Sequence, residues 1–416
     1  MSSDHDHDQA ATSPAPTDPP KTVEPRTGRT HRALALDVLR GMVIVLMALD
    51  HTRDFFSNAS IDPTDLQQTT AGLFFTRWIT HYCAPVFVFL AGMGIFLGGM
   101  HQSRAQHARY LLIRGLWLIL LEFTLVHWGW SFTFDFSRLI GQVIWAIGCS
   151  MIVMALLIRL PSWAVTLIGM AIVGGHNLFD TWTRIPEYRA WLVSLQLRPG
   201  LVAEWKWGSH EYALFVPYPF VPWLGIMALG YGCGDLFQRT REKGREIFMI
   251  LGGIAIGLFL LLRGLNGYGD PRPRNFYWES TTTLLSFLNC TKYPPSLDYS
   301  LMTLGPALIL LWALDKKDGP ILRFFATFGR VPLLIYLVHV PVIHLAILAV
   351  AQYRHGGFDF LLAHPISGRE AFPETFGFGL RGVYLAWALM IALLYPLALL
   401  FDWGKKKGTS PLWRLF

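Results

Sequence analysis

Long apolar segments recur along most of this chain, and they constrain its fold more than any other feature. A helix needs about 20 mainly apolar residues to cross the hydrocarbon core of a bilayer, and ten segments reach or approach that length. They are 33–51, 80–100, 110–128, 138–158, 162–179, 219–235, 247–264, 298–315, 331–352 and 383–402. Because they show no strand-like alternation, we expect an all-α polytopic membrane protein with about ten transmembrane helices.

The composition supports a membrane protein and excludes some other classes. Hydrophobic residues make up 53% of the chain and charged residues 15%, whereas soluble proteins carry about 25% charged residues. The net charge of +7 does not indicate nucleic-acid binding, because the basic residues fall in short loops between apolar segments. The four cysteines form neither a CxxC motif nor a metal-binding spacing, so no metal is predicted. The lipid bilayer is therefore the first expected partner.

Lysine and arginine residues are concentrated in alternate loops, which predicts the orientation. Loops 101–109, 159–162, 236–246 and 316–330 hold 11 Lys and Arg in 39 residues, and the longer loops on the other side hold 12 in 140. Short cytoplasmic loops of membrane proteins carry this positive excess. We expect both termini in the cytoplasm, with residues 1–31 as a disordered tail, 32–403 as the membrane domain and 404–416 as a basic tail.

Arg40 and His51 lie on the first apolar segment, in LDVLRGMVIVLMALDHTRD, residues 36–54. At about 1.5 Å rise per residue they are about 16 Å apart, roughly half the bilayer core. Ionisable residues at that depth are costly and are functional candidates. A neutral imidazole can take a proton from a hydroxyl or amine, or act as a nucleophile, and Asp54 can orient it from one turn further on. For Arg40, an ion pair with Asp37 is the structural alternative to binding an anionic ligand.

Lys292 lies in the turn that leads into the eighth apolar segment. Two prolines restrict this turn, and Ser296 is placed to cap the helix that follows. A lysine in such a turn can bind an anionic group or stabilise developing charge. The alternative is an interface-anchoring lysine beside Tyr293.

Three further polar residues fall inside apolar segments and are candidates for substrate binding. Glu122 lies in the third segment, while His339 and His344 lie in the ninth, on either side of a helix-kinking proline. These residues would line a polar cavity or a substrate path.

Two other stretches have recognisable composition. Loop 181–218 mixes aromatic residues and carboxylates, which suits either a sugar or polar headgroup or a membrane-surface helix. The run 217–234 is rich in small residues, which favours close helix packing.

Two resemblances add to this interpretation. The spacing of Arg40 and His51 is similar to the Arg-x10-His motif of membrane acyltransferases. Six segments in the same order resemble bacterial relatives of the heparan-alpha-glucosaminide N-acetyltransferase catalytic domain. They are residues 36–56, 81–94, 175–180, 218–232, 291–306 and 328–344.

The resemblance implies a transmembrane acyltransferase that takes acetyl-CoA, or another acyl-CoA, from the cytoplasm and acylates a sugar on the far side. It maps the arginine and histidine of the wider motif onto Arg40 and His51. The family's lysosomal enzyme has an asparagine at the position of His51, and this chain has no histidine between His51 and His81. The mechanism of that enzyme is therefore not transferred.

We accordingly expect an acyltransferase of the bacterial inner membrane, with a homodimer compatible with the sequence. Arg40 would bind the acyl donor, and His51, Asp54 and Lys292 would carry the chemistry on a hydroxyl or amine of a sugar, glycan or lipid-linked acceptor. The alternative is a transporter or flippase whose path is lined by Arg40, Glu122 and His339.

Overall fold

The computed structural model describes residues 27–180, 199–240, 245–362 and 372–408. The helices are α1 (Thr27–Phe56), α2 (Ala71–Thr80), α3 (Cys83–Gly99), α4 (Arg104–Leu121), η1 (Glu122–Val126), α5 (His127–Ser131), α6 (Val143–Leu157), α7 (Ser162–Gly175), η2 (His176–Phe179), α9 (Phe220–Arg239), α10 (Glu246–Leu265), α11 (Ser280–Leu288), α12 (Leu297–Ala313), α13 (Pro320–Arg330), α14 (Pro332–His355), η4 (Asp359–Leu361) and α15 (Leu380–Lys407). The strands are β1 (Arg138–Ile140), β2 (Gly200–Trp207) and β3 (His210–Val216).

The helices confirm an all-α polytopic membrane protein, and each of the ten predicted segments contains a helix. Within the described ranges, seven helical segments are long and apolar enough to cross a membrane. They are Ala71–Gly99, Arg104–Ser131, Ser162–Phe179, Phe220–Arg239, Glu246–Leu265, Pro332–His355 and Leu380–Lys407. The helices α6 and α12 are apolar but shorter, and the long helix α1 carries several charged residues.

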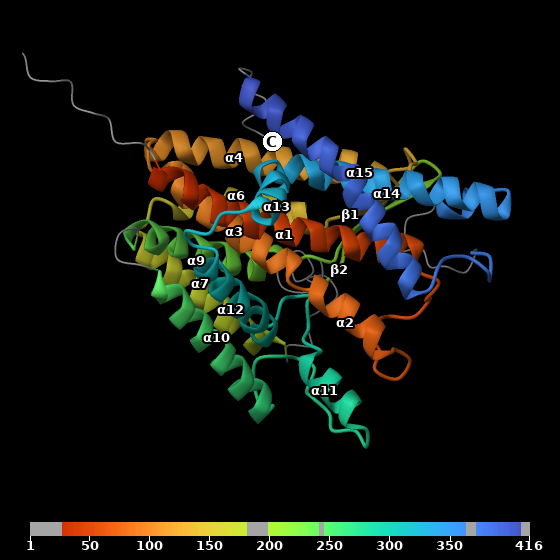
Figure 1. Ribbon diagram of the computed structural model, residues 1–416, viewed down its shortest axis with the longest axis horizontal. Helices are drawn as coiled ribbons and strands as arrows, with labels where there is room; N and C mark the ends of the chain where they lie inside the picture. The colour runs from red at the N-terminus through yellow and green to blue at the C-terminus, as the bar shows by residue number, and fades with distance from the viewer. Residues whose placement is uncertain (1–26, 181–198, 241–244, 363–371, 409–416) are drawn as a thin grey trace, which may run out of the picture.

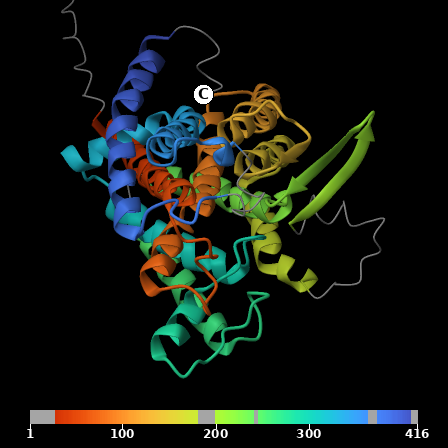
Figure 2. The same ribbon diagram turned by 90° about the vertical axis from the view of Figure 1, so that its right-hand side faces the viewer.

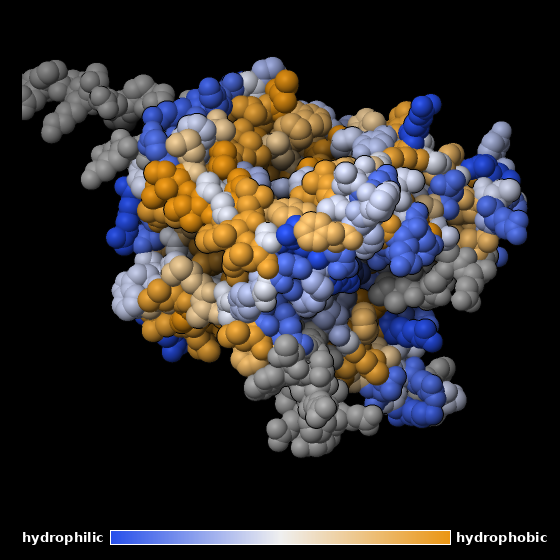
Figure 3. All heavy atoms as spheres, turned by 90° about the horizontal axis from the view of Figure 1, so that it is seen from below, coloured by the Kyte–Doolittle hydropathy of each residue, from blue (hydrophilic) through white to orange (hydrophobic). Residues whose placement is uncertain are grey.

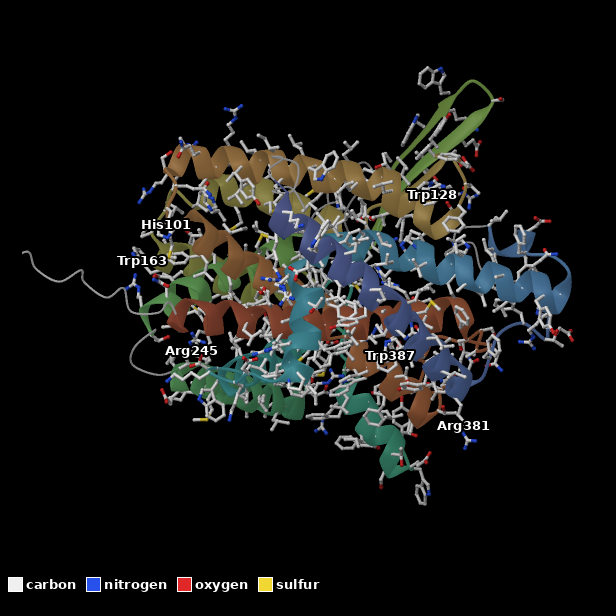
Figure 4. The ribbon with its side chains drawn as sticks, turned by 45° about the horizontal axis from the view of Figure 1, so that its top comes forward. His101, Trp128, Trp163, Arg245, Arg381 and Trp387 are labelled. Carbon is white, nitrogen blue, oxygen red and sulfur yellow. The ribbon has the colours of Figure 1, made fainter. Side chains whose placement is uncertain are left out.

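Labelled residues in or beside several loops of the two predicted sets lie at opposite ends of the molecule, whereas residues 320–330 of one predicted cytoplasmic loop form helix α13, which packs against α1. In Figure 4, His101, Trp163 and Arg245 lie toward the left-hand end, whereas Trp128 and Arg381 lie toward the right-hand end. Helix α1 runs between the two ends through the middle of the molecule (Figure 1). For these labelled residues, the separation agrees with the division that the basic residues predict.

Two helices extend beyond the predicted apolar spans. Helix α1 begins at Thr27, inside the predicted tail, of which residues 1–26 lie outside the described residues. It also continues past His51 to Phe56, because Asp50 pairs with Arg53 and His51 faces Asp54 across one helical turn. At the other end, α15 continues to Lys407, so the predicted tail from residue 404 starts as helix.

Helix α1 is enclosed by other helices along its length. It contacts α3, α13, α14 and α15, and apolar side chains such as Val38, Val43 and Ala48 are buried in these contacts. A polar side chain on such a helix has little access to water and needs a partner inside the protein. The partners of the polar residues of α1 therefore define the polar interior.

The small residues of the run 217–234 permit close helix packing, as predicted. A Cβ added at Gly230 of α9 would overlap the carbonyl oxygen of Phe89 on α3, and one added at Gly92 would overlap that of Met227. The two backbones therefore touch where only glycine fits.

A small sheet is the main departure from the predicted helices. Strand β3 pairs in parallel with β1 and antiparallel with β2, and Trp205 stacks on Tyr212 across the hairpin with ring centroids 5.4 Å apart. Because residues 138–140 form β1, the fourth predicted span starts at Val143 instead of 138. A surface helix is wrong for residues 200–216, while 181–198 lie outside the described residues. The hairpin extends away from the helices (Figure 2).

Exposed apolar side chains form an outer surface suited to lipid. Leu116 of α4, Leu167 of α7, Ile254 of α10 and Leu385 of α15 are all exposed. Hydrophobic residues cover much of the left half of the face in Figure 3. Apolar patches of this extent are rare on monomeric soluble proteins and expected on a lipid-facing surface.

The substitution Gly92→Ala tests the α3–α9 contact. Overpacking of this kind typically costs 1–3 kcal/mol, so the variant should lose its monodisperse form in detergent at a lower temperature than the native protein. The matched control is Gly94→Ala on the same helix, where an added Cβ meets no atom within 4 Å. Equal thermal stability of the two variants would contradict the packing described here.

Candidate functional site

A cavity of about 170 Å³ surrounds His51, and we call it the His51 cavity. Its wall is built from α1, α2, α3, α5, α6 and α14 and from the turns before α9 and α12. The lining residues are Met47, Asp50, His51, Arg53, Asp54, Arg77, Cys83, Ala84, Phe87, Trp130, Gln142, Val143, Ile144, Ile147, Tyr218, Lys292, Tyr293 and Tyr336. The cavity thus joins His51, Asp54 and Lys292, three residues predicted to act together.

The imidazole of His51 is held between a carboxylate and two rings. Its Nδ1 lies 3.5 Å from Oδ2 of Asp54, as the spacing on α1 predicts. The ring packs edge-on against Trp130, with centroids 4.9 Å apart, and lies 5.1 Å from the ring of His339. These contacts fix the plane of the imidazole and leave its other nitrogen, Nε2, on the side away from Asp54.

Asp50 is the centre of a buried ion network beside His51. It forms an ion pair with Arg77 of α2, accepts a hydrogen bond from Thr80 Oγ1 (2.9 Å), and lies 2.9 Å from Nη1 of Arg53. Arg53 in turn pairs with Asp54 through Nη2 (2.5 Å). The network connects α1 to α2 and fixes Asp54, the residue that faces His51.

Lys292 contributes a further positive charge to the His51 cavity. Its side chain is buried, with Nζ 5.1 Å from the centre of the Tyr293 ring. Tyr293 and Tyr218 are linked through their hydroxyls (3.2 Å). Burial alone would raise the pKa of Tyr293, but the charges of Lys292 and Arg77 hold that pKa below its usual value. With Arg53, Arg77 and Lys292 against Asp50 and Asp54, cations outnumber carboxylates in the wall.

Hydrogen bonds from two buried or half-buried side chains, Arg263 and Asp270, hold the segment that leads to and carries Lys292. The buried guanidinium of Arg263 donates to the carbonyl oxygens of Arg272, Ser286, Phe287 and Asn289, at 2.7–3.1 Å. The carboxylate of Asp270 accepts from the backbone N–H and the hydroxyl of Thr291 and from the hydroxyl of Ser296, at 2.6–2.8 Å. Ser296 also caps α12 by accepting from the N–H of Tyr299 (3.0 Å), as predicted.

A second, larger cavity of about 980 Å³ lies nearer the other end of α1, and we call it the Arg40 cavity. Five cationic side chains line it, against two carboxylates, Asp37 and Asp402. The five are Arg40, Arg114, Arg330, Lys405 and Lys406. Arg330, Lys405 and Lys406 lie at helix ends that adjoin predicted cytoplasmic segments, whereas Arg40 and Arg114 lie further inside α1 and α4. This excess of positive charge suits an anionic ligand.

Arg40 combines the predicted ion pair with a place in the cavity wall. Its Nη1 lies 2.9 Å from Oδ1 of Asp37 and donates to the carbonyl oxygen of Gly329 on α13 (3.2 Å). Arg330 pairs with Asp402 of α15 (2.9 Å). The ion pair and the ligand-binding role are therefore compatible, because the paired guanidinium still lines the cavity.

The two cavities share one part of their walls, which we call the apolar seam. It consists of Phe87 of α3 and of Ile144 and Ile147 of α6. Both isoleucines are buried. A ligand that extended from the Arg40 cavity to His51 would pass these three side chains.

Comparison with known families matches residues 32–264 to the heparan-alpha-glucosaminide N-acetyltransferase, catalytic, family. The chain belongs to this family. A search of curated proteins finds no match. Membership implies a membrane acetyltransferase and does not favour the transporter alternative. The matched range contains Arg40, His51, Asp54 and Arg77, whereas Lys292 lies beyond it.

Glu122 and His344, two of the predicted substrate-binding residues, do not line either cavity. Both contact backbone groups of other helices instead. Glu122 accepts a hydrogen bond from the N–H of Trp145 (3.0 Å), in the first turn of α6. The two ring nitrogens of His344 lie 3.2 and 3.1 Å from the carbonyl oxygens of Gly129 and Leu361. Glu122 therefore connects the end of α4 to the start of α6, and His344 connects α14 to α5 and η4.

His339 occupies an intermediate position. It does not line either cavity, yet its ring contacts that of His51. Its Nδ1 lies 3.0 Å from the carbonyl oxygen of Ile335 and must donate there, because a carbonyl oxygen only accepts. The ring of His339 therefore packs against the imidazole of His51 from outside the His51 cavity.

Sequence reasoning missed much of the charged wall. Asp50 points away from its neighbour His51 and faces Arg77 and Thr80 of α2. Arg77 lies between the first two predicted spans, and it precedes Thr80 by three residues and so shares a helix face with it. That spacing predicts a common helix face for Arg77 and Thr80, but it does not show that this face packs against α1. Among the described residues, no group of three or more His, Cys, Asp or Glu is arranged to hold a metal ion.

The substitution Asp50→Asn tests the ion network. Breaking a buried pair leaves an uncompensated charge and typically costs 3–5 kcal/mol, so the variant should unfold at a clearly lower temperature in detergent. The control is Lys206→Gln in the exposed pair with Glu211, where a loss of no more than about 1 kcal/mol is expected. Comparable thermal stability of both variants would mean that the Asp50 network does not hold the fold.

Proposed function

We propose that this protein transfers an acyl group, most simply acetyl, from cytoplasmic acyl-CoA to a hydroxyl or amine on the outer side of the membrane. The observation that carries the proposal is the pair of cavities along α1. A large basic cavity at one end meets a small polar cavity that contains His51, and the apolar seam is their common wall.

The Arg40 cavity supports the donor side of this proposal. Coenzyme A carries several phosphate negative charges on a bulky nucleotide and ends in a long, narrow arm. Arg40, Arg114 and Arg330 would bind the phosphates, because a guanidinium forms charge-assisted and often bidentate hydrogen bonds with phosphate oxygens. The arm would then extend along α1 toward His51.

The His51 cavity supports the chemical step. His51 would accept the proton of the acceptor hydroxyl or amine at Nε2, with Asp54 stabilising the imidazolium. The acceptor oxygen or nitrogen would bond to the acyl carbon, the carbon–sulfur bond would break, and the thiolate would take the proton from His51. Lys292 and Arg77 would stabilise the negative charge on the carbonyl oxygen in the transition state.

The acceptor would be a sugar, a glycan or a lipid-linked sugar. The turns before α9 and α12 border the His51 cavity through Tyr218 and Lys292, and both turns lie on the predicted outer side. A multi-pass protein of a bacterial inner membrane would thus receive the acyl donor from the cytoplasm and the acceptor from the opposite face.

The variant His51→Ala should abolish acyl transfer and remain folded in the membrane. Loss of general-base catalysis costs about 10²–10⁴-fold, and loss of a nucleophile costs at least as much. Purified protein in liposomes would be given acetyl-CoA labelled on the acetyl group, together with a mixed glycan and lipid extract. Free thiol and transfer of the label would both be measured.

The control for this experiment is His101→Ala, an exposed histidine in a loop at the far end of the molecule (Figure 4). It should retain native activity. Transfer retained in His51→Ala would remove the proposed role of His51. Samples denatured rapidly at neutral pH also distinguish the two forms of the mechanism, because label bound to the native protein and absent from His51→Ala would indicate an acyl-histidine intermediate.

The variant Arg40→Gln should raise KM for acetyl-CoA and leave kcat nearly unchanged. The amide can still bond to Asp37, but the positive charge that would face a phosphate is lost, and such a charged hydrogen bond is worth about 1.5–3 kcal/mol. Calorimetric titration with coenzyme A itself should show about tenfold or greater weakening. Unchanged coenzyme A binding would assign Arg40 to structure alone.

A further inference from the structure

We propose that the apolar seam of Phe87, Ile144 and Ile147 sets the length of the acyl group that this protein accepts, and restricts it to short chains such as acetyl. The inference rests on the proposed acyl transfer at His51. It assigns substrate specificity to three side chains that have no titratable group and no part in the chemical step.

The first observation is that both charged and apolar side chains line the His51 cavity. Asp50, Arg53, Arg77 and Lys292 are among the charged side chains, which would disfavour the methylene groups of an acyl chain. The seam, Met47 and Trp130 are among the apolar ones. An acyl chain would therefore lie against the seam, while the polar acceptor would contact the charged side chains.

The second observation is the available space. The His51 cavity, at about 170 Å³, is close in size to an engineered protein cavity of about 150 Å³ that holds one benzene molecule. This volume would have to contain both the acyl group and the reacting end of the acceptor. The Arg40 cavity, at about 980 Å³, would hold the bulky part of the donor. The size restriction therefore falls on the acyl group and not on the nucleotide.

The third observation is that α6 cannot easily move away to enlarge the space. A Cβ added at Gly148 would lie 2.7 Å from the carbonyl oxygen of Gly115 on α4, and the converse distance is also 2.7 Å. These helices are in backbone contact directly beside Ile147. Glu122 also binds the N–H of Trp145, which fixes the first turn of α6 next to Ile144. In a packed interior of this kind, adding or removing one methylene changes the packing of the neighbouring side chains.

The test compares acetyl-, propionyl-, butyryl- and hexanoyl-CoA as donors for the full-length protein in liposomes. Thiol release would be followed with the mixed glycan and lipid extract as acceptor. The native protein should show the highest kcat/KM with acetyl-CoA, because one methylene that does not fit changes such ratios by about 10- to 200-fold. In Ile147→Ala, which removes more volume than two methylenes occupy, the butyryl-to-acetyl ratio should rise about tenfold or more.

The matched control is Met151→Ala, one turn further along the same face of α6. Met151 is buried like Ile147, but it lines only the Arg40 cavity. This variant should lose comparable packing and keep the native order of donor preference. If Ile147→Ala does not fold, Ile147→Val replaces it, and its butyryl-to-acetyl ratio should rise by a smaller factor.

The outcomes separate this inference from the proposed function. Native protein that consumes hexanoyl-CoA as well as acetyl-CoA, or a seam variant with an unchanged donor ratio, would overturn the inference and leave acyl transfer intact. Native protein that releases no thiol from any of the four donors would overturn the proposed function and the inference together.

Discussion

The ion pair between Asp50 and Arg77 is the interaction on which the rest of the structure depends. Helix α1 is surrounded by other helices, so a carboxylate on it would be very costly without a partner. Arg77 supplies that partner from α2, and Arg53 links the pair to Asp54. The same contacts that make the buried charges tolerable also fix the carboxylate that faces His51. Stability and the geometry of the candidate site thus have a common origin.

The two cavities along α1 differ in the charged residues that line them. One end presents a basic cavity, and the other presents a small cavity in which cations and carboxylates alternate around His51. Between them, the apolar seam of Phe87, Ile144 and Ile147 offers no polar partner to water or ions. The proposed reaction would need such a division, because its donor and acceptor would approach from opposite sides while the membrane stays sealed.

Hydrophobic length predicted the ten helix-containing segments, since bilayer thickness fixes how long an apolar segment must be. It could not predict β1, because Arg138–Ile140 is apolar enough to extend the helix and pairs with a strand some 70 residues later in the chain. Helical spacing placed His51 beside Asp54 and Arg40 beside Asp37. It gave no information about Arg77 or about Glu122, whose partners belong to other helices. The sequence therefore predicted side-chain contacts within a helix but not contacts between helices.

The most direct test of the account is a cryo-EM structure of the protein with a non-hydrolysable acetyl-CoA analogue. The account predicts the phosphates among Arg40, Arg114 and Arg330, the arm alongside the apolar seam, and the acetyl group within reach of His51. An analogue bound elsewhere, or one whose acetyl group points away from His51, would contradict the central claim that the two cavities form one continuous donor site.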